Sequence, residues 1–283
     1  MQSYAYVIVN VFAQSHFGGN PLAVFPEADG LSQEAMQLIA RQFNLSETVF
    51  VKPATEQSAV KKLRIFTPEY ELPFAGHPTL GAAAVLRRAL DLPARYPLQT
   101  QAGRVEMVHQ NDQVRFGLRN LVEITPSALS VVQMAAILGL ESENIIGEVV
   151  NVNTGSAQTL VQLASAQAVT SCQIASALFL PHFARQSLYV WHESQGQVTA
   201  RLFFGQQGAV LEDPGTGSAA ANLGGWAIHH QRAPLAWQIA QGDVIHRPNR
   251  LALTVDNDNT IWVGGNVIEV GRGEFYLPSS ALD

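Results

Sequence analysis

The sequence predicts a protein of mixed helix and strand, built from two similar halves. The first observation is a repeat: the segment Glu71–His77 (ELPFAGH) returns about half a chain length later as Glu212–Ser218 (EDPGTGS), and an alanine-rich stretch follows each copy. The runs that precede them, Arg64–Phe66 and Arg201–Phe204, also agree. Two copies of one supersecondary unit are the economical interpretation.

The second observation is the alternation of apolar and polar residues, which is typical of half-buried strands. It predicts strands at 4–12, 48–52, 60–66, 103–109 and 112–118 in the first half, and at 146–152, 158–164, 187–193 and 197–204 in the second. Helices are expected between them.

Helical periodicity places the apolar residues of 35–43 on one face, with Ser32 as the N-cap. A second helix is expected to begin with Pro78 at its first position and to end near Arg87 and Arg88, where cations meet the negative end of the helix dipole. By the repeat, Ser218 is expected to cap a third helix. Residues Gly76-His77 and Gly217-Ser218 then lie at helix N-termini.

The domain organisation follows from Pro126, which interrupts the pattern and makes 123–127 the expected linker. We expect an N-terminal lobe of residues 1–125 and a C-terminal lobe of residues 126–283. An alternative for the last strand is a return to the N-terminal lobe.

Composition excludes several classes of function. Of the 283 residues, 14% are charged against roughly 25% in an average globular protein, and the formal charge of −6 with only 17 Lys and Arg argues against nucleic acid as a partner. No apolar run approaches the roughly 20 residues of a membrane span. The pattern of the N-terminal segment is typical of a strand and not of a signal peptide. We expect a cytoplasmic protein without membrane partners. The low charge favours a homodimer.

A lone cysteine, Cys172, excludes an intrachain disulfide, a cysteine-rich zinc site and any mechanism that needs two thiols. Its apolar surroundings indicate a small buried hydrophobe. The histidines outside the repeated turn have no ligand spacing, and no metal is expected.

Helix N-termini offer unpaired N–H groups and a partial positive charge, which suit a carboxylate and the charge that develops beside it. The glycines at 76, 215 and 217 allow close approach of the backbone to a ligand. The alternative is that the two repeated segments are only tight strand-to-helix turns.

The second copy also matches the G-x-G-x-x-A dinucleotide pattern over Gly215–Ala220. We reject this interpretation because Glu212-Asp213-Pro214 separates the pattern from the preceding strand, and because the first copy carries Phe74 where a glycine is required.

Four segments resemble the successive signature blocks of the phenazine-biosynthesis (PhzF-like) family, in the family's order and across almost the whole chain. They are Phe17–Val24 (FGGNPLAV), Asn44–Phe50 (NLSETVF), Phe66–Pro68 with Glu71–Pro78 (FTP and ELPFAGHP), and Glu212–Ala219 (EDPGTGSA). The resemblance implies the α+β fold of diaminopimelate epimerase: two pseudo-symmetric lobes, each a barrel-like, mostly antiparallel sheet around a central helix. It also implies an active site in the cleft between the lobes, a homodimer, and no cofactor or metal.

The related epimerases use a cysteine pair, which neither turn contains here. The PhzF-like pattern supplies instead a single carboxylate, which matches Glu47, with His77, Asp213 and Ser218 as polar neighbours. One acid/base moves a proton on one face of a substrate, which isomerises without racemising.

The expected roles follow from this pattern. Glu47 is the acid/base, while Ser218, His77 and the N–H groups near Gly76 and Gly217 hold the carboxylate and polar substituents of the substrate. Asp213 either binds an amino group or assists proton movement. Asn20 is a candidate for substrate binding.

Each assignment has a structural alternative: Glu47 as an exposed residue at a strand start, His77 as a cap, Asp213 and Asn20 as turn residues.

Together with this resemblance, the sequence predicts an isomerase of a small carboxylate-bearing substrate. At its most specific, the resemblance implies the activity of trans-2,3-dihydro-3-hydroxyanthranilate isomerase. A lyase using the same site, or a carboxylate-binding protein without turnover, are the alternatives. Two residues depart from the family pattern: Asn10, where an acidic residue is common, and Gly215, which we expect to enlarge the local pocket.

Overall fold

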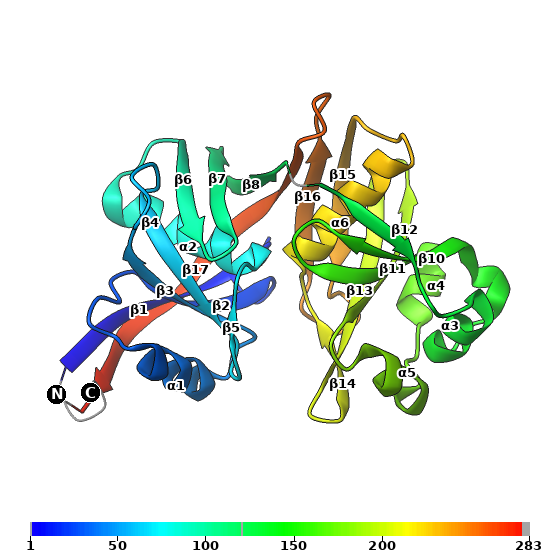
Figure 1. The fold of residues 1–283 in the computed structure, drawn as a ribbon, viewed down its shortest axis with the longest axis horizontal. Coiled ribbons are helices and arrows are strands. Elements are labelled where there is room, and N and C mark those ends of the chain that lie inside the picture. The colour runs from blue at the N-terminus through cyan, green and yellow to red at the C-terminus, as the bar shows by residue number, and fades with distance from the viewer. Residues whose placement is uncertain (1, 120, 279–283) are drawn as a thin grey trace. The chain divides into compact units, whose positions relative to one another are not determined.

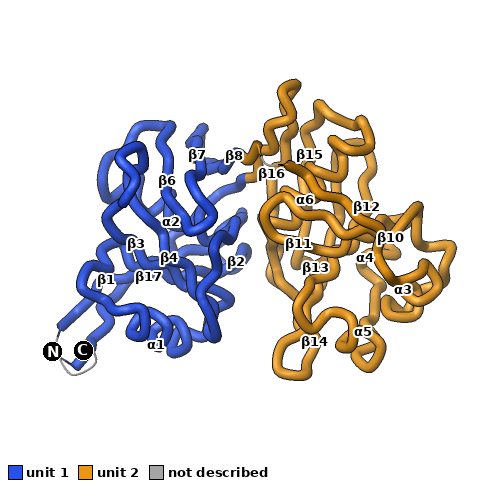
Figure 2. Tube along the Cα trace, in the orientation of Figure 1, with its two compact units in different colours: residues 1–117, 264–283 blue, residues 118–263 orange. Residues whose placement is uncertain are grey.

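The chain forms two compact units in the computed structural model, which describes residues 2–119 and 121–278. Unit 1 comprises residues 1–117 and 264–283, and unit 2 comprises residues 118–263 (Figure 2). The division at 117/118 differs from the expected boundary at 125/126. Strand β9 (Glu123–Pro126) occupies the expected linker and pairs with β10 (Ile145–Asn153) of unit 2.

The last strand, β17 (Ile261–Leu277), begins in unit 2 and continues into unit 1. There it pairs antiparallel with β1 (Gln2–Val11) along the whole length of β1. These backbone hydrogen bonds return the end of the chain to unit 1 (Figure 1).

Unit 1 is a closed barrel of eight strands. Its further strands are β2 (Asn20–Phe25), β3 (Thr48–Pro53), β4 (Lys61–Phe66), β6 (Arg95–Thr100), β7 (Gly103–Gln110) and β8 (Gln113–Leu118), with the short β5 (Glu71–Leu72) paired to β4. The ring runs β1–β2–β3–β4–β6–β7–β8–β17 and closes on β1. Within this ring, as far as the described residues go, the pairs β2–β3 and β4–β6 are parallel.

Helix α1 (Gln33–Phe43) covers an aromatic cluster in unit 1. The Ser32 hydroxyl accepts a hydrogen bond from the Ala35 N–H at 3.1 Å, so the predicted N-cap is confirmed. Asn44 ends the helix in the left-handed region with a φ of 53°. The chain therefore turns directly toward β3.

Helix α2 (Gly76–Leu90) is buried along Gly76–Leu86 and packs on β1, β2, β3 and β4 (Figure 1). Small residues make this possible. A Cβ at Gly81 would lie 3.1 Å from side-chain carbons of Val9 and Val11, so the backbone of the helix sits directly against the sheet. The helix begins at Gly76, two residues before the expected start at Pro78.

Unit 2 repeats the pairing order of unit 1. Its elements are β9, α3 (Val131–Leu138), the 3-10 turn η1 (Ser142–Asn144), β10, β11 (Ala157–Leu163), α4 (Ala166–Ser171), α5 (Ser176–Phe183), β12 (Ser187–Ser194), β13 (Gln197–Gln206), β14 (Ala209–Asp213), α6 (Gly217–His229), β15 (Leu235–Gln241) and β16 (Asn249–Val255). The pair β11–β12 is parallel like β2–β3, and β13–β15 is parallel like β4–β6. Helix α6 packs on β10, β11 and β16. The predicted duplication and its strands are confirmed.

An arginine–glutamate pair, partly buried in unit 1 and buried in unit 2, holds the hairpin before the repeated turn in each unit. In unit 1 it joins Arg64 to Glu71, with Nη2 donating to Oε2 at 2.6 Å. In unit 2 it joins Arg201 to Glu212 at 2.7 Å, and Arg201 also donates to the Cys172 carbonyl at 2.9 Å. Both side chains of the second pair are 9% exposed. The pair fixes β14 against β13 immediately before Asp213.

We predict that Arg201→Met lowers the free energy of unfolding by about 3–5 kcal/mol, because it leaves the Glu212 charge buried without its partner. Urea denaturation measures this change. Arg250→Met is the matched control: its pair with Asp243 is more exposed, so its loss should cost no more than about 1 kcal/mol. Equal costs for the two substitutions would contradict a structural role for the buried pair.

None of the helices within residues 2–119 and 121–278 has the length and apolar character that a membrane crossing requires.

Candidate functional site

Unit 1 brings together three of the predicted site residues. Glu47 lies just before β3, and His77 is the second residue of α2. The His77 Nε2 and a Glu47 carboxylate oxygen are 3.5 Å apart, with the two side chains 6% and 16% exposed. On its other side, the His77 Nδ1 lies 3.5 Å from the Asn20 amide nitrogen. The start of α2 thus holds an imidazole beside a mostly buried carboxylate, which comes from the segment just before β3.

Burial sets the charge state of His77. Desolvation lowers its pKa to about 3, although a hydrogen bond with the Pro21 carbonyl acts in the opposite direction. His77 is therefore neutral near pH 7. Its contact with Glu47 is consequently one between a neutral ring and a carboxylate, and not an ion pair.

We predict that His77 makes the stability of the protein depend on pH. Below pH 6.5 the unfolded state takes up a proton at this residue and the folded state does not. The free energy of unfolding should therefore fall, as pH decreases from about 6.5 toward 3, by about 1.4 kcal/mol per unit more in the wild type than in His77→Gln. Urea titrations at several pH values measure both slopes, and parallel curves would contradict the buried neutral state.

In unit 2, Asp213 ends β14 and its position is fixed by two neighbours. The Thr216 hydroxyl donates to an Asp213 carboxylate oxygen. The buried Gln241 amide donates to the Asp213 carbonyl at 2.9 Å and to the Thr216 hydroxyl oxygen at 3.0 Å, and it accepts from the Thr216 N–H at 3.3 Å. The turn that leads into α6 is therefore held by side chains from both of its ends and from β15.

Tyr189 on β12 is a buried neighbour of this turn. Burial raises the pKa of its hydroxyl, and the negative charge of Asp213 adds to the effect. Tyr189 therefore stays protonated.

Ser218 is the second residue of α6, as His77 is of α2. It does not cap its helix, contrary to expectation, because the N-cap is Thr216. The Ser218 hydroxyl oxygen accepts a hydrogen bond from the Gln158 amide of β11 at 3.1 Å. The hydroxyl is thus bound from the sheet side.

Gly76 and Gly217 are the first residues of their helices, and neither helix has a side-chain cap. The first N–H groups of a helix have no partner within it. The predicted N–H groups are thus placed at both helix starts.

Sequence reasoning missed Gln158, Thr216, Gln241 and Tyr189. Both of the first two had a signal in the sequence. Thr216 lies inside the repeated segment, and Gln158 lies in Gly155–Val161, a stretch that echoes Gly19–Val24 around Asn20. Gln241 and Tyr189 had none, because they come from strands that only the fold brings to the turn.

Gly215 has a packing reason that differs from the expected enlargement of a pocket. A Cβ at this position would lie 2.6 Å from the Asn249 Cγ. The space beside Gly215 is therefore filled by β16, and the glycine is required by this close approach.

We predict that Gly215→Ala lowers the free energy of unfolding by about 1–3 kcal/mol through overpacking against Asn249. Gly271→Ala serves as the control, since a Cβ there meets nothing within 4 Å. Thermal and urea unfolding of both variants measure the difference. An unchanged free energy of unfolding in Gly215→Ala would show that β16 can move to make room for the methyl group.

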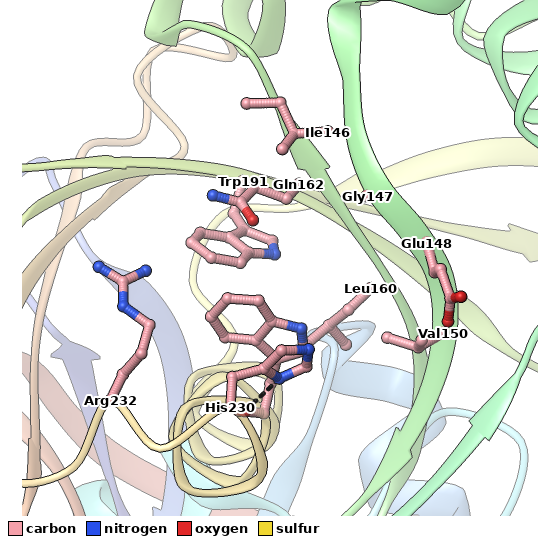
Figure 3. Close-up of a pocket in the computed structure, with 10 residues that line it drawn as sticks. Ile146, Gly147, Glu148, Val150, Leu160, Gln162, Trp191, His230 and Arg232 are labelled. Carbon is pink, nitrogen blue, oxygen red and sulfur yellow. Dashed lines mark hydrogen bonds between the residues drawn. The ribbon is translucent and has the colours of Figure 1, made fainter.

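A pocket of about 400 Å³ lies elsewhere in unit 2, near the C-terminal end of α6 (Figure 3). Trp191 and Trp226 meet edge to face with ring centroids 4.8 Å apart, and His230 stacks on Trp226 at 4.1 Å. None of the predicted site residues lines it. Its position at the other end of α6 separates it from Ser218.

Within the described residues, no group of three or more His, Cys, Asp or Glu side chains is arranged to hold a metal ion. Cys172 is buried, as expected, and burial raises the pKa of its thiol to about 11. The thiol is therefore protonated near neutral pH.

The fold and these groups define a duplicated α+β protein with polar side chains at the N-termini of two central helices. A PhzF-family phenazine biosynthesis protein of Bacillus anthracis has the same fold, with a TM-score of 0.84 at 23% identity over 98% of this chain and 100% of that one.

The comparison of sequences identifies the family. A family model described as phenazine biosynthesis-like protein matches residues 9–273. An uncharacterized isomerase of Pasteurella multocida is 58% identical over 98% of this chain and 95% of its own length. The trans-2,3-dihydro-3-hydroxyanthranilate isomerase of Pseudomonas chlororaphis is 36% identical over 96% and 99%. The chain belongs to the phenazine biosynthesis-like (PhzF) family and is an isomerase.

Proposed function

We propose that this isomerase moves a proton on a small substrate that carries a carboxylate, with Glu47 as the acid/base and without a cofactor. The reaction of trans-2,3-dihydro-3-hydroxyanthranilate isomerase is its most specific form. The contact between Glu47 and the neutral His77 is the observation that carries this proposal.

The difference between the two repeats supports a single acid/base. The strand registers pair Thr48 with Phe66 and Leu188 with Phe203, and each phenylalanine also pairs with the glutamate of its repeat. Ser187 is therefore the counterpart of Glu47. A carboxylate occurs at this position in one copy alone, which favours removal and return of a proton on one face of the substrate.

His77 has a defined part in this proposal. A neutral imidazole can hydrogen-bond to Glu47 or to a substrate oxygen without adding a positive charge. A cation beside Glu47 would lower the basicity of the carboxylate. A neutral ring orients the carboxylate and leaves it able to take up a proton.

The remaining groups hold the substrate in the proposal. The helix N-termini at Gly76 and Gly217, with Ser218, suit the substrate carboxylate and charge that develops on it. Asp213, which Thr216 and Gln241 hold in place, suits a substrate amino group or a proton in transit. Asn20, whose amide nitrogen lies beside the His77 ring, contributes to substrate binding in this proposal.

We predict that the wild type rearranges trans-2,3-dihydro-3-hydroxyanthranilate in deuterated water with unchanged heavy-atom composition and uptake of deuterium. Glu47→Gln should slow this by about 100- to 10,000-fold, the usual contribution of a general acid/base. Proton NMR follows the reaction, and mass spectrometry follows the product. Glu56→Gln, at an exposed position of the same unit, should leave the rate unchanged.

Other outcomes decide between the alternatives. Loss of a water from the product would make the protein a lyase. If this substrate is untouched, other small carboxylates are screened for deuterium uptake. Binding without uptake from any of them would indicate a carboxylate-binding protein, and full activity of Glu47→Gln would remove Glu47 from the mechanism.

A further inference from the structure

A chain of buried amides leads from the strands of unit 2 to Ser218. Its members are the backbone N–H of Thr154 and the side-chain amides of Asn222 and Gln158, three residues that are at most 4% exposed. Asn222 lies on α6 and Gln158 on β11. All of the hydrogen bonds in this chain are made within unit 2.

The orientation of the Asn222 amide is fixed by backbone groups. Its oxygen accepts from the Thr154 N–H at 2.8 Å, and its nitrogen donates to the carbonyls of Val152 and Ser156 at 2.9 and 2.8 Å. A backbone N–H can only donate and a carbonyl can only accept. The amide cannot be reversed without breaking all three bonds.

Asn222 in turn orients Gln158. The two protons of the Asn222 amide are shared among these two carbonyls and the Gln158 side-chain oxygen. The other end of the Gln158 amide is therefore its NH₂ group, which donates to the hydroxyl oxygens of Ser218 at 3.1 Å and Ser156 at 3.3 Å. The backbone groups around Asn222 therefore fix the direction of each hydrogen bond in the chain, up to the one that Ser218 accepts.

We propose that Gln158 and Asn222 are positioning residues that hold the Ser218 hydroxyl as a hydrogen-bond donor to the substrate. Because the Ser218 oxygen accepts from Gln158, its own proton points away from that amide and toward an acceptor. The hydroxyl then offers its proton to a carboxylate or to another oxygen acceptor of the substrate. This inference rests on the proposed function, in which Ser218 contacts the substrate.

The first test needs no ligand. In spectra of ¹⁵N-labelled protein, the Gln158 side-chain amide is assigned from its loss in Gln158→Met. Ser218→Ala removes the acceptor of this amide, so its proton resonances should move upfield, while those of Asn222 stay. Unmoved Gln158 resonances would overturn the chain of hydrogen bonds, whatever the protein catalyses.

The second test measures binding of 3-hydroxyanthranilate, an unreactive aromatic carboxylate, by calorimetry. Gln158→Glu keeps an acceptor for Asn222 but offers no donor to Ser218, whose hydroxyl then turns toward the new carboxylate. We expect about 10- to 100-fold weaker binding, the value of a hydrogen bond to a charged group. Gln158→Met, which adds no charge, should weaken binding about 3- to 10-fold.

Gln162→Glu is the matched control, because it places the same charge on the same strand about 13 Å away and its side chain takes no part in the chain of amides. It should bind as the wild type does. Spectra and melting curves show whether each variant is folded, and Gln158→Met carries the test if Gln158→Glu does not fold.

The outcomes separate the two levels of inference. If both Gln158 variants bind 3-hydroxyanthranilate with dissociation constants within twofold of the wild-type value, the positioning role is overturned, even if turnover is present. If the wild type rearranges the proposed substrate and the Gln158 variants raise KM with little change in kcat, the role stands. If the wild type neither binds nor turns over any small carboxylate, the proposed function fails and the inference fails with it, while the spectra still report on the hydrogen bonds.

Discussion

Each half of the molecule depends on burying a helix against its own strands on nearly every side. This is possible only where the helix carries small residues, as at Gly81 in α2 and Gly224 in α6, where a Cβ would press on strand side chains. Such a helix cannot tilt or slide without opening the core. The first turn of each helix is therefore held in place, and so are His77 and Ser218, which lie in these turns.

Duplication with divergence explains why one scaffold has two kinds of helix start. The arginine–glutamate pairs are kept in both copies and hold both hairpins. The residues beyond them differ: the first copy has Glu47 and a neutral imidazole, and the second has serines at both equivalent positions. The two copies of one fold thereby carry different chemical groups, as the single acid/base of the proposed function requires.

The two groups of polar residues are controlled by different physical effects. In unit 1, desolvation dominates, because burial removes the charge of His77. In unit 2, hydrogen-bond direction dominates, because backbone groups orient Asn222 and, through it, Gln158. Both effects act through neighbours that do not belong to the repeated segment.

The sequence by itself determined the duplication, the positions of most strands and helices, and the candidates Glu47, His77, Asp213 and Ser218. The duplication, strands and helices follow from periodicity and turn residues, which are local properties of the chain. The four candidates follow from the resemblance of short segments to the family's signature blocks. Only the tertiary structure decided that β17 closes the first barrel, that Gly215 is required by Asn249, and that Gln158 orients Ser218. Strand pairing, burial and the direction of a hydrogen bond depend on atoms from distant parts of the chain, and no local pattern specifies them.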